Sequence, residues 1–280
     1  MAAPMFDLLA QTAPDATPSI MEKLARTPLS SILWFAAICT VLRFGLGYWA
    51  NHLEENLEVT SAKVVRFFHD MTDALVYASI LVFLLLRPYV LQTFRIPSES
   101  MVPTLKVGDW IIVNKFAYRL GDPQFGDIVV FKPPKRALYS WQDPNQDFVK
   151  RLIGMPGDVI EIRDSVLYRN GKQVDEPYRN EQNIGDFKLV KYHGELVPLV
   201  RFGTGGIPRD SLYVDKVNPQ DVEAVWELPS EPIPDGFYLM MGDNRNWSAD
   251  GRVWGLVPRR QIVGKAWFRV FPFSRLGGLH

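Results

Sequence analysis

Two long apolar runs near the N-terminus constrain the fold of this chain more than any other feature. Residues 29–50 read LSSILWFAAICTVLRFGLGYWA, and residues 74–94 read ALVYASILVFLLLRPYVLQTF. A helix of about 20 apolar residues is long enough to cross a bilayer. Each run therefore predicts a transmembrane helix. The first run begins too late for a cleaved signal peptide, and its alternative interpretation is a helix buried in a protein core.

The segments around these runs set the expected topology. Residues 1–28 predict a mobile N-terminal tail, and residues 51–73, which are rich in charge, predict a connector between the spans. Two spans place both ends of the chain on the same side of the membrane. The positive-inside rule leaves the side open, because the tail and the connector carry two basic residues each (Lys23 and Arg26; Lys63 and Arg66).

The character of the sequence changes after residue 94. Short β-branched runs such as DWIIVNKF, GDIVVFKP and DVIEIRD alternate with turns of Gly, Pro and Asp. This pattern predicts a mainly β domain over residues 95–280. RNGK at 169–172 predicts a hairpin turn. Residues 173–236 are richer in Pro and polar residues, and they predict an insertion on the strand framework.

Charge and cysteine content limit the kinds of partner. The 31 basic and 31 acidic side chains cancel, so no net positive charge argues for nucleic acid as a partner. Cys39 is the only cysteine, which excludes an intramolecular disulfide and a zinc site made of several thiolates. Its place in an apolar run predicts a small buried side chain rather than a reactive thiol.

Two serines two places apart, Ser98 and Ser100, follow shortly after the second apolar run. A serine hydroxyl is a poor nucleophile unless a base takes its proton, and histidine is the usual base. The histidines are poorly placed, with two in the connector, one in the insertion and one at the last position (His52, His69, His193 and His280). A Ser-His-Asp triad is therefore not expected.

Lysine is the other candidate base, and Lys150 lies in the apolar strand pattern DFVKRLIGMPGD. An amine accepts a proton only when it is neutral, so burial must bring its pKa several units below about 10.4. On a strand, Lys150 shares one face with Phe148 and Leu152. The pattern alone leaves open whether Lys150 is a buried base or an edge-strand lysine that blocks aggregation.

A third stretch, MGDNRNWSADGRVWG at 241–255, groups Asp, Asn, Arg and Ser between two strands. Taken alone it predicts a polar turn, because these residue types favour turns. As a functional loop, it offers a hydroxyl and a carboxylate to orient a lysine.

Together these stretches resemble the bacterial type I signal (leader) peptidases. IPSESM-PTL-VGD, GDIVVFK, DFVKRLIGMPGD and GDNR--SADGR-WG-VP occur in the order of that family, and the ending VGKAWFRVFPFSRLGGLH is similar to that of Gram-negative members. The resemblance covers most of residues 80–160 and 237–280. It implies a mainly β fold with a catalytic core of the signal-peptidase and LexA-like type. That core carries an inserted β-rich lobe and follows two transmembrane helices.

The resemblance implies a Ser-Lys dyad. Ser100 corresponds to the nucleophile of the family, and Lys150 corresponds to its general base. Ser98 corresponds to the serine whose hydroxyl forms the oxyanion hole together with the backbone N–H of Ser100. No metal and no cofactor are implied.

Two further residues are implied to orient the base. Ser248 corresponds to the serine that hydrogen-bonds the lysine, and Asp250 corresponds to the carboxylate beside it. Asp250 is expected to act through a loop arginine, either Arg245 or Arg252. The chain departs from the common family pattern at Glu99 (often Gly), Val149 (often Ile), Asn246-Trp247 (often Asp-Asn) and Gly251 (often Ser).

The resemblance also implies a substrate groove. The residues that match shallow S1 and S3 pockets are Phe94, Ile96, Pro97, Met101 and Val149. Such pockets accept small side chains, which implies cleavage after Ala-X-Ala, with the extended substrate bound along a strand edge. An apolar surface near Phe94 is expected to meet lipid. Trp267 and Phe271 are candidates for the same surface, but they are interpreted as ordinary strand core.

The implied function is that of a membrane-bound serine endopeptidase that removes N-terminal signal peptides from exported preproteins. The expected location is the inner membrane, multi-pass, with a cytoplasmic connector and the catalytic domain on the periplasmic side, where cleavage sites emerge. Expected partners are signal peptides, the lipid bilayer and, indirectly, the secretion translocon. Two alternatives remain: a self-cleaving repressor-type Ser-Lys protein, for which no helix-turn-helix is evident, and a catalytically inactive membrane-tethered scaffold that binds exported chains.

Overall fold

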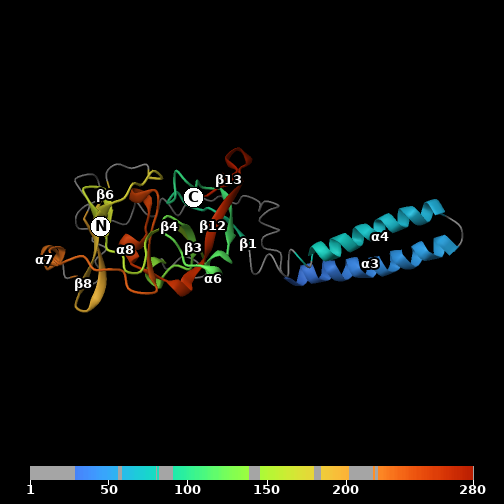
Figure 1. The fold of residues 1–280 in the computed structure, drawn as a ribbon, viewed down its shortest axis with the longest axis horizontal. Helices are drawn as coiled ribbons and strands as arrows, with labels where there is room; N and C mark the ends of the chain where they lie inside the picture. Colours follow the sequence, from blue (N-terminus) through green and yellow to red (C-terminus); the bar gives the residue numbers. More distant parts are fainter. Residues whose placement is uncertain are drawn as a thin grey trace. The chain divides into compact units, whose positions relative to one another are not determined.

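The computed structural model describes residues 29–55, 59–79, 81, 91–138, 146–179, 184–201, 217 and 220–279. The chain divides into two compact units, Met1–Gln92 and Thr93–His280. The first unit contains a pair of helices, and the second contains two β-sheets (Figure 1). The predicted N-terminal tail lies outside the described residues.

The first unit is built from α3 (Leu29–Glu55) and α4 (Val59–Ser79), which pack against each other. Cys39 of α3 is buried, as its apolar surroundings predicted. The buried residues of α4 recur at helical spacing and therefore share one face: Val65, Thr72 and Val76. An ion pair also joins the two helices, with Arg43 Nε lying 2.6 Å from Asp73 Oδ1.

The helix boundaries differ from the sequence interpretation. α4 begins inside the predicted connector and includes the first residues of the second predicted span, while residues 80 and 82–90 of that span lie outside the described residues. A helix accommodates the charged connector because Lys63, Arg66 and Asp70 lie on its exposed face. The last residues of the predicted span belong to a strand, β1 (Leu91–Arg95), because they pair with the larger sheet. Among the described residues, no helix is both long enough and apolar enough to cross a membrane.

In the described part of the second unit, eight strands form a sheet with the order β1-β2-β12-β3-β4-β10-β11, and β13 pairs with β12. The prediction of a mainly β domain is confirmed. β4 lies between β3 and β10 and runs antiparallel to both. The strands are β1, β2 (Trp110–Asn114), β3 (Ile128–Phe131), β4 (Phe148–Gly154), β10 (Phe237–Met241), β11 (Val257–Pro258), β12 (Ile262–Phe271) and β13 (Gly277–Gly278).

A smaller sheet forms a separate lobe of this unit, and its five described strands have the order β7-β6-β5-β8-β9. Its strands are β5 (Ile160–Arg163), β6 (Val166–Arg169), β7 (Lys172–Gln173), β8 (Asp186–Tyr192) and β9 (Glu195–Arg201), and α7 (Val222–Trp226) packs against β8. The predicted β-rich lobe is confirmed, but its predicted start at residue 173 is wrong. The lobe begins at β5, because β5 pairs with both β6 and β8.

The hairpin predicted at 169–172 is confirmed. Asn170 and Gly171 join β6 to β7, and Arg169 pairs with Lys172 across the turn. Both central residues have positive φ angles, 53° at Asn170 and 75° at Gly171. A two-residue hairpin loop of this kind requires positive φ at both positions, which Asn-Gly adopts readily.

Short helical turns complete the second unit. They are α6 (Ala117–Leu120), η2 (Lys135–Ala137), η3 (Arg245–Trp247), α8 (Gly251–Trp254), η4 (Arg259–Gln261) and η5 (Phe273–Arg275). α8 is capped by Asp250, whose side chain accepts a hydrogen bond from the backbone N–H of Arg252. η3 and α8 both lie within the polar stretch at 241–255, which begins at the last residue of β10.

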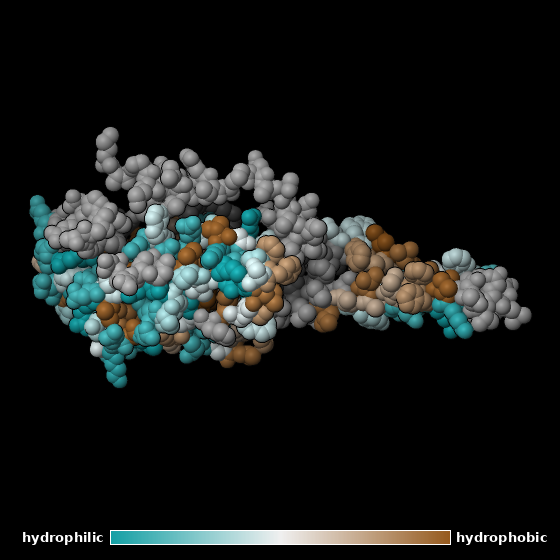
Figure 2. Space-filling view, turned by 90° about the horizontal axis from the view of Figure 1, so that it is seen from above, coloured by the Kyte–Doolittle hydropathy of each residue, from teal (hydrophilic) through white to brown (hydrophobic). Residues whose placement is uncertain are grey.

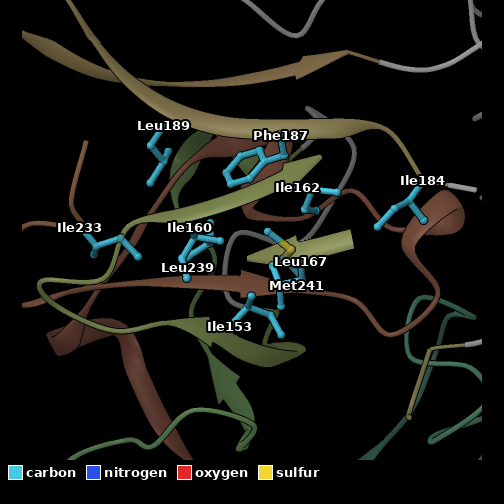
Figure 3. Close-up of a cluster of buried hydrophobic side chains, with 10 residues drawn as sticks. All are labelled: Ile153, Ile160, Ile162, Leu167, Ile184, Phe187, Leu189, Ile233, Leu239 and Met241. Carbon is cyan, nitrogen blue, oxygen red and sulfur yellow. The ribbon is translucent and has the colours of Figure 1, made fainter. Parts of the chain in front are cut away.

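An apolar core joins the two sheets. Figure 3 shows side chains from β4 and β10 of the larger sheet pointing toward side chains from β5, β6 and β8 of the smaller one. The cluster consists of Ile153, Ile160, Ile162, Leu167, Ile184, Phe187, Leu189, Ile233, Leu239 and Met241. The smaller lobe therefore packs directly onto β10, which precedes the polar loop, and onto β4, which carries Lys150.

Apolar side chains are also exposed on both units. Brown, hydrophobic residues cover much of the helical pair in Figure 2, whereas the visible face of the β unit is mostly hydrophilic. On the β unit, Trp267 is 57% exposed and Phe271 is 45% exposed, so their interpretation as strand core is wrong. Alternation along β12 places the buried Ala266 on one face and Trp267 on the other.

Candidate active site

The loop that carries both serines spans residues 96–109 and is closed at its ends by the backbone. The N–H of Ile96 donates a hydrogen bond of 2.8 Å to the carbonyl of Asp109. Met101 is buried in an apolar cluster with strands of the larger sheet, next to Ser100 in the chain. These contacts fix the backbone on both sides of Ser100, whose own side chain is largely buried.

Lys150 lies on β4 in the interior of the larger sheet. The sheet register places it opposite Val129 of β3, and β10 pairs with β4 on the other side. The edge-strand interpretation of Lys150 is therefore wrong. Lys150 is only 5% exposed, and its Nζ lies 6.0 Å from the centre of the Phe148 ring. The predicted embedding of this lysine among apolar side chains is confirmed.

The fold brings the lysine and the two serines together. Lys150 Nζ donates a hydrogen bond of 2.5 Å to Ser100 Oγ. Ser98 Oγ lies 3.3 Å from Ser100 Oγ, and either hydroxyl can be the donor. Ser98 itself is exposed, while Ser100 and Lys150 are buried. A hydroxyl at hydrogen-bond distance from a buried amine has the geometry that general-base activation of a nucleophile requires.

Burial lowers the pKa of the Lys150 amine from its ordinary value to about 8. The charges of Asp250 and Asp243 raise this pKa in part, and the nearby Arg252 lowers it again. Desolvation prevails because it disfavours the ammonium form more than the carboxylates stabilise it. A pKa near 8 leaves about a tenth of the amine neutral at pH 7, which suffices for a general base.

Asp250 is a fully buried carboxylate held by Arg252. Arg252 Nε donates to Asp250 Oδ1 (2.9 Å), and Arg252 Nη2 donates to Asp250 Oδ2 (3.0 Å). The N–H of Gly242 also donates to Asp250 Oδ2, at 2.9 Å. Burial alone raises the pKa of this carboxyl, but Arg252 and these hydrogen bonds bring it below its usual value. Of the two arginines expected beside Asp250, Arg252 forms the bidentate pair with its carboxylate.

Ser248 lies in the same loop but does not bond to the lysine. Within the described residues, its buried Oγ makes no hydrogen bond, so the predicted hydrogen bond to Lys150 is not made in this structure. Ser248 and the backbone carbonyl of Ser100 both pack against Gly242, with no room for a Cβ at that position. Ser248 is therefore close to the serine loop, and its role as an orienting residue stays a prediction.

The chain is similar in sequence to known proteases. A model of the family described as signal peptidase, peptidase S26, matches residues 69–271. The chain belongs to this family. The probable signal peptidase I-1 of Synechocystis sp. is 36% identical over 214 residues, which cover 76% of this chain and 88% of that protein. Signal peptidase IB of Staphylococcus aureus (strain Mu50) is 38% identical over 186 residues, 66% of this chain and 81% of that protein.

A solved structure is also similar. Signal peptidase I of Enterococcus faecalis V583 is 27% identical and covers 52% of this chain and 97% of its own, with a TM-score of 0.31. The sequence relatives and the family match identify this chain as a signal peptidase I, a serine hydrolase, as its motifs implied. The finer assignment to the Gram-negative type stays a prediction.

The signal peptidase site contains a buried ion pair that sequence reasoning missed. Arg151, next to the lysine on β4, donates from Nε to Asp243 Oδ1 and from Nη2 to Asp243 Oδ2, both at 2.8 Å. The Arg151 side chain is 2% exposed and that of Asp243 is fully buried. Thr104 Oγ1 donates to Asp243 Oδ2 at 2.5 Å.

Among the described residues, no cluster of three or more His, Cys, Asp or Glu side chains is arranged to hold a metal ion.

Asn244 is a second missed residue, and it connects the polar loop to the serine loop. Its backbone N–H donates to the carbonyl of Ser100 at 3.2 Å, and its Nδ2 donates to the carbonyl of Glu99 at 3.1 Å. Asp243 and Asn244 lie in the same polar stretch as Ser248, which was a possible signal of a role in the site. Only the fold shows which residues they contact.

Four of the five predicted substrate-binding residues gather in one apolar cluster. Ile96 and Met101 are fully buried members, and Phe94 and Val149 are half-buried at its margin. Pro97 is exposed and is not part of the cluster. Phe94 and Val149 are thus the partly exposed members of the cluster, Ile96 and Met101 are its buried members, and their role in binding substrate stays a prediction.

Proposed function

We propose that this signal peptidase cleaves exported preproteins with a Ser100–Lys150 dyad, on the C-terminal side of Ala-X-Ala sites. The observation that carries the proposal is the hydrogen bond of 2.5 Å between a buried lysine amine and a serine hydroxyl. The lowered pKa of that amine, about 8, supports the role of base. Ser98 and the neighbouring carboxylates supply the remaining polar groups of the site.

The first half of the reaction forms an acyl-enzyme. Neutral Lys150 Nζ takes the proton of Ser100 Oγ while Oγ attacks the scissile carbonyl carbon. The Ser98 hydroxyl and the Ser100 backbone N–H donate to the oxyanion that develops on the carbonyl oxygen. The tetrahedral intermediate then collapses as the C–N bond breaks, and the leaving amine of the mature protein takes the proton from Lys150.

The second half of the reaction releases the signal peptide. Lys150, neutral again, takes a proton from a water molecule, and the hydroxide attacks the ester carbonyl of the acyl-enzyme. The same two donors, Ser98 and the backbone of Ser100, stabilise the second oxyanion. The proton then returns from Lys150 to Ser100 Oγ, which restores the free enzyme.

The substrate is proposed to bind as an extended strand beside the serine. β1 is the terminal strand of the larger sheet in the described part of the chain, so it offers backbone groups for strand addition. The half-buried side chains of Phe94 and Val149 are proposed to line a shallow apolar surface for the residues before the cleaved bond. A shallow apolar surface of this kind favours alanine at the positions before the cleaved bond.

The proposed location is the inner membrane, multi-pass, with the catalytic unit on the periplasmic side. The exposed apolar residues of the helical unit support a contact with lipid, among them Trp34, Phe44 and Tyr48 of α3 and Phe67 and Tyr77 of α4. On the β unit, the exposed Trp267 and Phe271 are proposed to contact lipid as well. The secretion translocon is proposed as an indirect partner, because it delivers the preprotein to the periplasmic side of the membrane.

A cleavage assay separates the enzyme from an inactive scaffold. The full-length chain is expressed with a secretory preprotein whose signal peptide ends in Ala-X-Ala, and the precursor and mature forms are separated by electrophoresis. Wild type should convert the precursor, and Ser100→Ala should leave it intact. Equal precursor with both would reject the peptidase. Variants of the Ala positions to large residues should block cleavage by wild type.

A further inference from the structure

A short segment of the smaller lobe, residues 174–179, contacts the polar loop at 241–255 through Glu176. This loop is called the catalytic loop below. Arg245 Nη1 donates to Glu176 Oε2 at 3.1 Å, and Arg245 Nη2 donates to Glu176 Oε1. The Arg245 side chain is fully buried and that of Glu176 is 4% exposed. The pair is therefore a two-pronged, water-excluded ion pair between the inserted lobe and the loop that follows β10.

Arg245 also contacts Gly242 and Arg252, two residues near the base. Its Nε donates to the carbonyl of Gly242 at 3.0 Å, and its own carbonyl accepts a hydrogen bond from Arg252 Nη2. Gly242 and Arg252 are the two residues that hold the buried carboxylate of Asp250. The geometry of Asp250 thus depends on where Arg245 is held.

The same segment reaches the other side of the site through Tyr178. The Arg151 guanidinium carbon lies 3.9 Å from the centre of the Tyr178 ring, a cation–π contact. The Tyr178 hydroxyl donates to Glu176 Oε1 at 3.0 Å, which ties the two contacts together. Arg151 is the neighbour of Lys150 on β4 and the partner of Asp243.

We propose that residues 174–179 act as a strap that holds the catalytic loop and the lysine strand in register, with Glu176 and Tyr178 as positioning residues. This inference rests on the proposed dyad. Neither residue touches the reacting atoms, and each acts through an arginine. Glu176 acts through Arg245 on the carboxylate of Asp250, and Tyr178 acts through Arg151 on β4.

The pKa of Lys150 distinguishes a positioning role of the strap from a contact that only stabilises the fold. The charged groups that act on the amine of Lys150 are Asp250, Asp243 and Arg252, and all three belong to the loop that the strap holds. When the strap is released, this loop separates from β4 and water reaches the amine. The pKa of Lys150 should then rise from about 8 toward its ordinary value.

The experiment compares strap variants of the full-length chain in detergent micelles. Glu176→Gln alone leaves a buried guanidinium without its carboxylate and is expected to lower the melting temperature. The double variant Glu176→Gln with Arg245→Gln removes both charges of this pair, so the melting temperature should recover in part. Arg179, whose Nη1 lies 3.5 Å from Glu176 Oε2, loses this carboxylate in both variants but still donates to the carbonyl of Ser165. Its kcat/KM should nevertheless stay about ten- to a hundredfold below wild type, because the loop is no longer positioned. The midpoint of its pH–rate profile should move to higher pH.

Tyr178→Leu tests the second contact without any change of charge. It should lower kcat/KM and shift the midpoint in the same direction as the double variant. Tyr178→Phe, which keeps the ring over Arg151, should restore most of the rate. The matched control is Tyr168→Leu in the same lobe, where Arg163 lies 4.2 Å from the ring of Tyr168.

Asp158→Asn is the matched control for the carboxylate. Asp158 is a buried carboxylate of the same lobe, and it pairs with Arg169 at 2.8 Å. Asp158→Asn should lower the melting temperature and leave the midpoint unchanged. A double variant with wild-type rate and midpoint would overturn the strap. The strap would also be overturned if the controls, Tyr168→Leu and Asp158→Asn, shifted the midpoint as much as Tyr178→Leu does.

A direct titration separates this inference from the proposed function. The ¹³Cε resonance of Lys150, assigned by its loss in Lys150→Met, is followed against pH in wild type and in Tyr178→Leu. If wild type fails to cleave precursors, the peptidase proposal fails, and this titration still decides the strap. A higher pKa in Tyr178→Leu supports the strap, and an identical pKa rejects it.

Discussion

Lys150 Nζ and Ser100 Oγ lie 2.5 Å apart although they are 50 residues apart in the sequence. One comes from the interior of the larger sheet, and the other from a loop closed onto that sheet by backbone hydrogen bonds. The chemistry of the pair depends on the charge of the amine, because a protonated lysine has no lone pair to accept the serine proton.

Replacing the base by a permanently charged group should abolish cleavage. Lys150→Arg keeps a cation at this position, but a guanidinium stays protonated at any pH that the fold tolerates. We expect no conversion of an Ala-X-Ala precursor above the level of Ser100→Ala. Lys132→Arg, at a half-exposed lysine paired with Asp147, is the control and should retain full activity. Turnover by Lys150→Arg would remove this lysine from the role of base.

The Ser98 hydroxyl should contribute to the rate and little to stability. It is exposed and lies 3.3 Å from Ser100 Oγ, where it can donate to a developing oxyanion. Ser98→Ala should lower kcat by about 10²–10³ and leave the melting temperature within a degree or so of wild type. Single-turnover cleavage and a thermal melt measure the two quantities. An unchanged kcat would show that backbone donors are sufficient.

Gly242 should not tolerate a side chain. A Cβ at this position would clash with the carbonyl of Ser100 and with Ser248. Gly242→Ala should therefore displace the serine loop and lower kcat/KM by about a hundredfold. Gly277→Ala is the matched control, because a Cβ at Gly277 meets no atom within 4 Å. Equal activities for the two variants would show that the loop shifts without consequence.

The buried amine should make the fold less stable than an apolar replacement, in a pH-dependent way. The pKa of Lys150 is about 8 in the folded chain, against 10.5 ordinarily. Between these values the unfolded chain binds a proton that the folded chain lacks, so stability rises with pH. Below pH 8 the penalty is complete. Lys150→Met should therefore be more stable than wild type at pH 7 by up to about 3 kcal/mol, since one pKa unit is worth about 1.4 kcal/mol.

Denaturant unfolding of the β unit at pH 7 and pH 10 measures this difference. The advantage of Lys150→Met should shrink as the pH rises from 8 toward 10.5, because the wild-type amine loses its proton in both states. A stability difference that is the same at both pH values would mean that the folded and unfolded amines titrate alike.

Features that depend on neighbouring residues were predictable from the sequence. The Asn-Gly turn at 170–171 needs only a local backbone conformation, and the fold contains it. The alternation of apolar side chains around Lys150 indicated a buried strand, and β4 is such a strand. Ser100 and Lys150 were predicted together because their motifs resemble those of one family, and the fold places them in contact.

Features that depend on distant parts of the chain were not predictable. Arg151 and Asp243 are 92 residues apart, and neither residue type alone signals a buried pair. The start of the smaller lobe was missed because the pairing that joins β5 to the predicted insertion is with β8, about 25 residues further along the chain. Trp267 was interpreted as core because its strand is apolar, but more than half of its side chain is exposed.

The most direct test of the dyad is a titration of the Lys150 amine in the folded, full-length chain in detergent micelles. The ¹³Cε chemical shift is recorded from pH 6 to 11, alongside kcat/KM for an Ala-X-Ala precursor. The resonance should titrate with a midpoint near 8, and kcat/KM should rise with pH through the same midpoint as the amine loses its proton. An amine that stays protonated up to about pH 10, with a rate that is constant between pH 7 and 9, would contradict the role of Lys150 as the base.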